Sequence, residues 1–309
     1  LNRRHKTMVG GHEAPDRNAE YLLYQTLVGT WPLEAEREGG WPAYVKRIQD
    51  YMDKALLEAK IHTSWINPNE AYHAATRGFI ERILDPAPGN EFVAKVGEFV
   101  GQLIYPGMLN SLSQVLLKTA SPGVPDFYQG SEIWNLSLVD PDNRRPVNYA
   151  ERRRLLASLR ECEREGQCEF LERLAKEPND GRLKLWVTQR SLLFRRSHRA
   201  LFEHGSYTPV PARGKRREHV IAFGRAFERQ AVLAVAGRYF HKLGAVAAGG
   251  LTAELWEETE LVLPRGMAGN RFRDALTGRE VDAEGRERGR RIRLREILAP
   301  LPVALLERM

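Results

Sequence analysis

Residues 121–134 read SPGVPDFYQGSEIW, and this stretch decides which fold the sequence favours. After a Pro-Gly turn signal, residues 124–128 form a short run of bulky and aromatic side chains, which predicts a brief strand. Gly130 lets the backbone leave sharply, so Gln129 and Glu132 are expected where this strand ends. In α/β barrels the ligand lies over the carboxyl ends of the strands, so these polar groups are candidates for a binding site.

Helical patterns lie on both sides of this predicted strand. The segment 92–117 is apolar around much of its circumference and contains Pro106-Gly107, so we expect two buried helices or one kinked helix there. A helix followed directly by a strand favours the last repeat of an α/β barrel over a helical bundle. Apolar residues spaced by three or four predict further helical segments at 21–29, 42–59, 72–84, 149–176 and 183–198.

The periodicity of the apolar residues changes after residue 201. Short apolar runs separated by Gly, Pro and Asn predict an all-β module that the C-terminal strand closes. These runs are residues 219–223, 231–235, 255–263 and 302–306. We therefore expect an α/β plus all-β fold with two domains: a barrel segment over residues 1–200 and an antiparallel β-sandwich over residues 201–309.

The composition is typical of a globular protein that neither spans a membrane nor binds nucleic acid. Of the 309 residues, 42% are hydrophobic and 28% are charged. No apolar run approaches the ~20 residues that a membrane helix needs. The formal net charge is +7, but the basic stretches 213–217 and 286–295 carry no interleaved aromatic residues for base stacking.

The cysteine content and the chain start indicate a cytoplasmic setting. Cys162 and Cys168 are the only cysteines, which excludes a disulfide framework and leaves a zinc site without partners, so we expect reduced thiols. His5 and His12 lack the neighbouring ligands that a metal site requires. The chain opens with Leu1 and has no secretory signal, and we expect it to be a piece of a longer polypeptide.

The block EAKIHTSWINPNEAY at residues 58–72 combines hydrogen-bonding groups with flat apolar faces at the end of a predicted helix. Sugars favour this mixture, because a pyranose ring presents an apolar face to Trp or Tyr and a rim of hydroxyls to polar groups. The alternative is a helix C-terminus at which Lys60 and His62 meet the helix dipole and Trp65 is a core residue. A lone Glu132 cannot perform glycoside chemistry, which needs two carboxylates.

A second polar block, VDPDNRRPVN at residues 139–148, places aspartates beside paired arginines. Bidentate hydrogen bonds between them would hold the loop rigid. The alternative is a salt-bridged surface turn. No phosphate-cradling glycine loop or nucleophile elbow occurs in the sequence.

Taken together, these blocks resemble a known family. PGVPDFYQGSEIW followed by LVDPDNRRPV is similar to the region around the eighth barrel strand of the α-amylase superfamily. AEYLLYQTLVGTWP at residues 19–32 and the block at residues 58–75 resemble the maltooligosyl trehalose synthases in particular. FRDALTG at 272–278 and LPVALL at 301–306 fit the closing β-domain of that family.

The resemblance implies the C-terminal part of a (β/α)8 barrel with a helical insertion, and an intramolecular transglucosylation in trehalose biosynthesis. Such an enzyme converts the reducing-end α-1,4 linkage of a maltooligosaccharide into an α,α-1,1 linkage without a cofactor or a metal, by a retaining mechanism. The family's nucleophilic Asp, acid/base Glu and third Asp should precede residue 1. We therefore expect no catalytic residue here, inactivity of the chain alone, and dependence on the N-terminal part of the same polypeptide.

The resemblance also implies roles on the substrate side of the site. Lys60 and His62 would donate to sugar hydroxyls, Trp65 and Tyr128 would stack on sugar rings, and Glu132 would brace the barrel mouth. Asn135 and Asn148 depart from the family, in which we expect Asp, and Arg144 and Arg145 are assigned to loop architecture first. The remaining predicted substrate-binding residues are Asn67, Tyr72 and Gln129.

Several alternatives stay open at this point. Within the superfamily they are the hydrolase that releases trehalose and a general α-amylase, against which the insertion around His62 argues. Outside it they are a non-catalytic carbohydrate-binding or partner-docking module and a nucleic-acid binder, whose affinity would fall steeply with salt.

Overall fold

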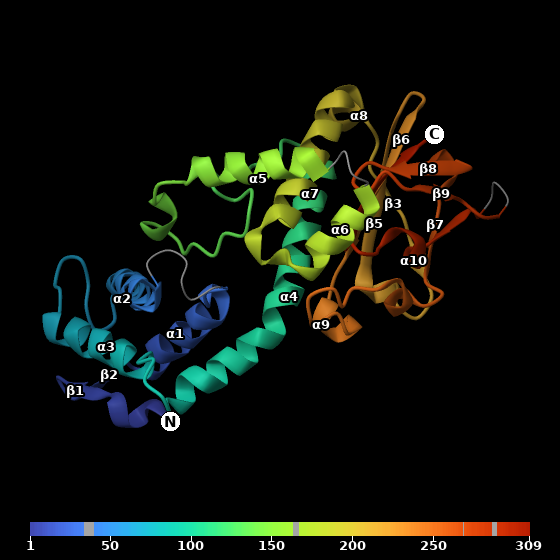
Figure 1. Cartoon of the computed structure of the whole chain (residues 1–309). Helices are drawn as coiled ribbons and strands as arrows, with labels where there is room; N and C mark the ends of the chain where they lie inside the picture. Colours follow the sequence, from blue (N-terminus) through green and yellow to red (C-terminus); the bar gives the residue numbers. More distant parts are fainter. Residues whose placement is uncertain (34–39, 163–166, 268, 286–288) are drawn as a thin grey trace. The chain divides into compact units, whose positions relative to one another are not determined.

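The computed structural model describes residues 1–33, 40–162, 167–267, 269–285 and 289–309 (Figure 1). The side chains of Cys162 and Cys168 and part of the basic stretch 286–295 lie outside the described residues. Tertiary contacts divide the chain into two compact units. The first comprises Leu1–Gly101 and Leu136–Pro146, and the second comprises Gln102–Asn135 and Val147–Met309. The expected division of the chain into domains at residue 200 stays a prediction.

The first unit is a helical layer with one small hairpin. Its elements are β1 (Thr7–Val9), β2 (His12–Ala14), α1 (Arg17–Thr30), α2 (Gly40–Ala59), α3 (Glu70–Ile83) and the first third of α4 (Glu91–Ala120). The three helices predicted over 21–84 are confirmed. Local capping explains two of their starts: the Asp16 carboxylate accepts the Ala19 N–H at 2.8 Å, and Asn69 Oδ1 accepts the Tyr72 N–H at 3.1 Å. The apolar faces meet in a core that includes Leu23, Leu27, Ile48, Met52 and Phe79.

The second unit combines helices with two antiparallel sheets. The helices are the rest of α4, α5 (Tyr149–Cys162), α6 (Gln167–Lys176), α7 (Arg182–Ser197), α8 (Arg199–His204), α9 (Phe240–Leu243) and α10 (Leu294–Ile297). α4 is one helix with Pro106 inside it, so of the two expectations for 92–117 the single helix is the one observed. None of the described helices has the length and apolarity needed to cross a membrane.

The strands of the second unit lie after residue 207 and form two sheets. The larger sheet has the order β3-β5-β6-β11-β8-β9 and the smaller one the order β10-β7-β4, all with antiparallel neighbours. Their strands are β3 (Thr208–Pro209), β4 (Ala212–Arg213), β5 (Val220–Phe227), β6 (Gln230–Gly237), β7 (Glu260–Val262), β8 (Arg271–Asp274), β9 (Glu280–Asp282), β10 (Arg291–Arg293) and β11 (Val303–Arg308). The antiparallel strands predicted beyond residue 201 are confirmed, including the C-terminal one. The sandwich arrangement stays a prediction.

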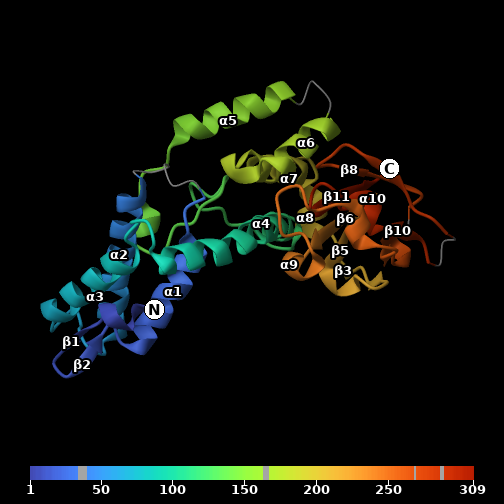
Figure 2. The same ribbon diagram turned by 60° about the horizontal axis from the view of Figure 1, so that its bottom comes forward.

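The central strand β6 is apolar without interruption from Ala231 to Ala236, and its two buried faces explain why. Val232, Ala234 and Ala236 belong to a core shared with α4, α6 and α7, while Leu233 and Val235 belong to a second core shared with β7 and β10. Side chains alternate along a strand, so a strand buried on both faces needs a continuous apolar run. Figures 1 and 2 show α6 and α7 beside this sheet.

The strand predicted over residues 124–128 is wrong. These residues belong to no strand, and β1 and β2 are the only strands in the described part of residues 1–200. Val124 is 95% exposed and Tyr128 78% exposed. Bulky side chains favour extended backbone, but a strand forms only where a neighbouring strand accepts and donates its backbone hydrogen bonds. No such neighbour is present in the described chain, so the predicted barrel portion is not confirmed.

Candidate functional site

The loop at residues 60–69 joins α2 to α3 and carries most of the predicted sugar-contacting residues. Lys60 ends α2 in the left-handed conformation, with φ of 57°, and its N–H donates to the Leu56 carbonyl at 3.3 Å. This conformation turns the chain away from the helix axis, which usually needs Gly or Asn. Both Lys60 and Asn67 are exposed. The Asn67 N–H donates to Ser64 Oγ at 3.0 Å.

Trp65 lies at the exposed tip of this loop. Its side chain is 59% exposed, and its indole N–H donates to Glu58 Oε1 at 3.2 Å. Ile61 and Ile66 are 65% and 98% exposed. The alternative that Trp65 is a core residue is therefore wrong, and the loop presents a flat aromatic face that a pyranose ring could stack on.

A buried chain of hydrogen bonds fixes the loop from below. Asp53 of α2 accepts from His73 Nδ1 of α3 at 2.9 Å, and His73 Nε2 lies 3.0 Å from Thr63 Oγ1. Thr63 Oγ1 in turn accepts the Asn69 N–H at 2.9 Å, and Arg77 donates to the other oxygen of Asp53 at 2.6 Å. In the neutral ring, Nδ1–H donates to Asp53, so the Thr63 hydroxyl donates to Nε2. The loop is thus tied to both flanking helices.

His62 is held in place by Asp16 and Tyr72. His62 Nε2 lies 2.9 Å from Asp16 Oδ2, and the ring stacks on Tyr72 with centroids 4.7 Å apart. Burial raises the pKa of Asp16, but hydrogen bonds from the Ala19 N–H and from His62 outweigh it, so the pKa lies below its ordinary value. Tyr72 is buried, and its hydroxyl accepts the Asp16 N–H at 3.0 Å. Tyr72 therefore supports His62 and does not reach the surface.

The second group of predicted residues lies in the second unit, around Gly130. Gln129 Oε1 accepts from the Tyr149 hydroxyl at 3.0 Å, and Glu132 pairs with Arg152 of α5 at 3.0 Å. Arg152 also donates to the Gly130 carbonyl at 2.7 Å. Gly130 has a φ of 92°, which favours glycine. Tyr128 remains exposed, so among the three predicted residues here it is the one available for stacking.

The arginine-rich loop at residues 139–148 is braced by α2. Arg47 Nε donates to both oxygens of Asp142 at 3.0 and 2.9 Å, and Lys54 pairs with Asp140 at 3.2 Å. Arg144 also pairs with Asp140, and Arg145 pairs with Asp142 at 3.2 Å, so their predicted role in loop architecture is confirmed. Arg47 and Lys54 were missed because their spacing in α2 is that of an ordinary solvated helix face.

The predicted residues thus form two separate groups, each belonging to its own unit. Lys60, His62 and Trp65 share one loop, while Tyr128, Gln129 and Glu132 share another segment. Within the residues that the structure describes, no cluster of His, Cys, Asp and Glu could hold a metal ion. The sequence did not reveal Asp16, Asp53, His73 and Arg152, which support these residues from neighbouring helices or, for Asp16, from a helix cap.

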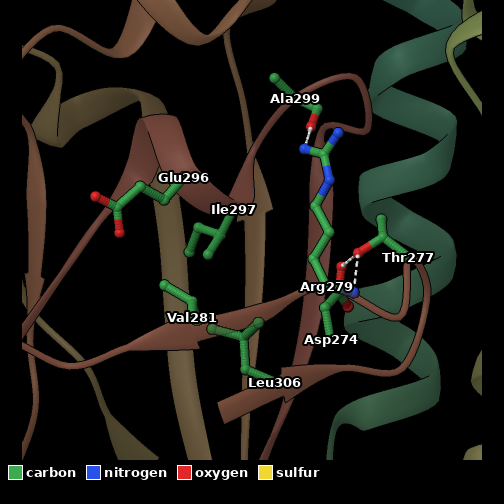
Figure 3. A pocket seen from close by; sticks show the side chains of 8 residues that line it. All are labelled: Asp274, Thr277, Arg279, Val281, Glu296, Ile297, Ala299 and Leu306. Atoms are coloured by element: carbon green, nitrogen blue, oxygen red, sulfur yellow. Dashed lines mark hydrogen bonds between the residues drawn. The ribbon is translucent and has the colours of Figure 1, made fainter. Parts of the chain in front are cut away.

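Figure 3 shows a small cavity in the β-rich part of the second unit, and its lining residues stabilise the fold and do not form a binding site. Its volume is about 10 Å³, enough for about one water molecule and far too small for a sugar ring. Asp274 is buried there and accepts from the Leu276 and Leu305 N–H groups at 3.1 and 3.0 Å and from Thr277 Oγ1 at 2.7 Å. Burial raises the pKa of Asp274 and outweighs these hydrogen bonds, which lower it. The motif FRDALTG therefore has a structural role: it forms a turn whose Asp274 carboxylate accepts the Leu305 N–H of β11.

Comparison with known proteins identifies relatives over nearly the whole chain. No family model matches. The chain is 35% identical over 295 residues to proteins of Mycobacterium tuberculosis strains CDC 1551 and H37Rv, which bear maltooligosyl trehalose synthase as a provisional name. This match covers 96% of the chain and 32% of each relative. The maltooligosyltrehalose synthase from Arthrobacter ramosus matches with a TM-score of 0.72 at 33% identity, covering 96% of this chain and 33% of that one.

A second solved maltooligosyl trehalose synthase matches with a TM-score of 0.66 at 28% identity, covering 95% of this chain and 34% of that one. The chain is thus a homologue of glycosyltrehalose-forming enzymes, and it spans about a third of the length of the relatives that it matches. Within that class, it corresponds to part of the maltooligosyl trehalose synthases, and the resemblance found in its motifs is confirmed.

Proposed function

We propose that this chain is part of an enzyme that converts the reducing-end α-1,4 linkage of a maltooligosaccharide into an α,α-1,1 linkage. The observation that carries the proposal is the match to maltooligosyl trehalose synthases over 96% of the chain at 33–35% identity. The activity belongs to the complete enzyme. The chain alone is expected to be inactive, because the three acids that the family uses should lie in the part that it lacks. We expect the enzyme in the cytoplasm.

The chemistry follows the retaining scheme with two carboxylates. One carboxylate attacks the anomeric carbon, the bond to the reducing-end glucose breaks, and an acid protonates the leaving oxygen. The released glucose must then turn over, so that its anomeric hydroxyl attacks the covalent intermediate and returns a proton to the acid/base residue. Transfer exceeds hydrolysis only if the pocket holds this glucose and excludes water.

This chain would contribute side chains that hold the released glucose in the pocket. Trp65 offers an exposed indole face, and Lys60 and His62 offer donors on the same short loop. The buried hydrogen bonds below the loop and the Asp16 contact to His62 fix these groups before substrate arrives. Preformed contacts avoid an ordering cost at the moment of binding. Tyr128 would add a second stacking face, and Glu132 would brace its own segment through Arg152.

The test is an assay of the complete enzyme with maltopentaose, followed by NMR of the anomeric protons. The expected result is loss of the reducing-end signal and growth of an α,α-1,1 signal with little free glucose. Free maltose or glucose as the main product would identify a hydrolase instead. The chain alone should give no turnover. Calorimetric titration of the chain alone with maltopentaose tests the rival reading: tight binding, together with no activity in the complete enzyme, would identify a carbohydrate-binding module.

A further inference from the structure

His62 is hydrogen-bonded through one of its two ring nitrogens. Nε2 lies 2.9 Å from Asp16 Oδ2, whereas Nδ1 has no hydrogen-bond partner among the residues that the structure describes. The side chain is 18% exposed, and Nδ1 is not among the buried unpartnered atoms, so solvent reaches it. The neighbouring ring on this side belongs to His12 of β2, with centroids 5.1 Å apart. His62 therefore presents one nitrogen that a ligand can contact.

Asp16 determines which nitrogen of His62 carries the proton. The pKa of Asp16 lies below the ordinary value of 3.8, so the carboxylate is ionised at neutral pH and can only accept hydrogen bonds. Its Oδ1 accepts the Ala19 N–H at 2.8 Å, and its Oδ2 faces His62. Nε2 must therefore be the donor to Asp16. In the neutral ring this leaves Nδ1 with a lone pair and no proton.

Neighbouring contacts also fix the orientation of the ring. It stacks on Tyr72 at an interplanar angle of 26°, and the buried Tyr72 hydroxyl accepts the Asp16 N–H at 3.0 Å. The Asn69 side chain donates to the His62 carbonyl at 3.3 Å and so holds the backbone. A flipped ring would place a carbon opposite Asp16 and lose the hydrogen bond. Nδ1 is thus held on the open side of the ring.

We infer that Asp16 is a positioning residue that keeps His62 Nδ1 unprotonated, so that His62 accepts a hydrogen bond from a sugar hydroxyl. The inference rests on the proposed function in that an α-glucan occupies this loop, and it adds how one hydroxyl is recognised. The donor role expected for His62 requires a second ring proton, and in the neutral state the donor of the loop is Lys60. A lone pair distinguishes a hydroxyl from a group that can only accept.

The first test reads the tautomer by long-range proton–nitrogen NMR of the chain with labelled histidine. At about pH 8.5, where imidazole side chains are ordinarily neutral, His62 should show a protonated Nε2 and an unprotonated Nδ1. Asp16→Asn should reverse this pattern. The Asn oxygen must stay with the Ala19 N–H, so its amide N–H faces Nε2 and donates to it.

Two further variants complete this test. His62→Gln identifies the resonances by their loss. Asp16→Ser keeps an N-cap acceptor but brings no amide donor to Nε2, so it should not reverse the tautomer. A protonated Nδ1 in wild type, no reversal in Asp16→Asn, or a full reversal in Asp16→Ser overturns the inference.

The second test asks whether the lone pair binds a hydroxyl. Inhibition constants of the complete enzyme, with maltopentaose as substrate, are measured for maltotriose and for maltotrioses in which one hydroxyl is replaced by fluorine, which cannot donate. At least one analogue should bind wild type about 3- to 10-fold more weakly than maltotriose. In Asp16→Asn, where Nδ1 donates, the same analogue should lose about twofold or less. The same losses in both enzymes would remove His62 Nδ1 from sugar recognition.

Failure of this inference is distinguishable from failure of the proposed function. A complete enzyme that releases glucose as its main product contradicts the proposed function, and the fluorinated series still reports on His62 because it measures binding. A complete enzyme that forms the α,α-1,1 product but shows no difference between wild type and Asp16→Asn in that series contradicts only the inference.

Discussion

At the scale of the residue, Arg225 illustrates how the second unit satisfies its own helix ends. Arg225 is 1% exposed, and within the described residues its hydrogen bonds go to backbone carbonyls and to no carboxylate. Its guanidinium instead donates to backbone carbonyls at the C-terminal ends of α4 and α8 and just beyond α8, where a helix leaves carbonyls without an intrahelical N–H partner or with only a capping one. These are Ala120, Leu201, Phe202 and Gly205, with Ser206 beyond them, at 2.7–3.4 Å.

Arg225→Met is therefore expected to lower the free energy of unfolding by about 3 kcal/mol or more, because several buried carbonyls lose their donor. Urea denaturation of the two proteins measures the difference. Arg190→Met serves as the control, because that arginine is less buried and its Nε donates to the Ala275 carbonyl at 3.2 Å. Equal losses of unfolding free energy in the two variants would show that the hydrogen bonds from Arg225 to these carbonyls do not stabilise the fold.

Asp16 gives a pH-dependent prediction. Its pKa in the folded chain lies below the ordinary value of 3.8. A lowered folded pKa contributes stability that is fully present above the unfolded pKa and is lost as the pH falls through the folded pKa. Asp16→Asn keeps an N-cap acceptor but removes the charge beside His62. The melting temperature of wild type should exceed that of the variant near pH 6, and the two should converge as the pH falls below the folded pKa of Asp16. A difference in melting temperature that stays the same at every pH would contradict the lowered pKa of Asp16.

At the scale of the element, the sequence predicted what depends on local pattern and missed what depends on a neighbour. The helices α1, α2 and α3 were predictable because an apolar face repeats every three or four residues. Residues 124–128 have strand-like side chains but no adjacent strand, so the pattern alone misled. Asp53 and His73 were not found, because a buried polar pair between two helices leaves no signal in either helix alone.

The buried hydrogen-bond chain below the 60–69 loop predicts how that loop responds to one hydroxyl. Thr63→Val leaves the Asn69 N–H and His73 Nε2 without a partner, at an expected cost of about 1–3 kcal/mol. Thr63→Ser keeps the hydroxyl and serves as the matched control. Hydrogen exchange of peptides from 60–69 should accelerate in the Val variant and stay near wild type in the Ser variant. Equal exchange in all three proteins would show that this hydrogen-bond chain does not hold the loop.

At the scale of the whole molecule, the proposed function has the chain supply substrate contacts and depend on a larger enzyme for the reactive acids. Both predicted groups of contact residues are held by bonds inside their own units, His62 by Asp16 and Glu132 by Arg152. The composition and motifs could single out candidates for contact with a sugar, and that assignment stays a prediction. They could not predict the supporting bonds, since these join positions 20 to 46 residues apart.

Trp65 tests the link from this loop to the balance between transfer and hydrolysis in the complete enzyme. Losing a stacking face of this kind costs about 0.5–1.5 kcal/mol, so Trp65→Ala should lower kcat/KM for maltopentaose about 3- to 10-fold. The share of free glucose should rise, because a loosely held glucose leaves before it attacks the intermediate and water replaces it. Trp65→Phe should restore part of the transfer, and Ile66→Ala, at a neighbouring position that is 98% exposed, should change neither quantity. Unchanged kinetics and product ratio in Trp65→Ala would place the loop outside the substrate site, whatever reaction the enzyme performs.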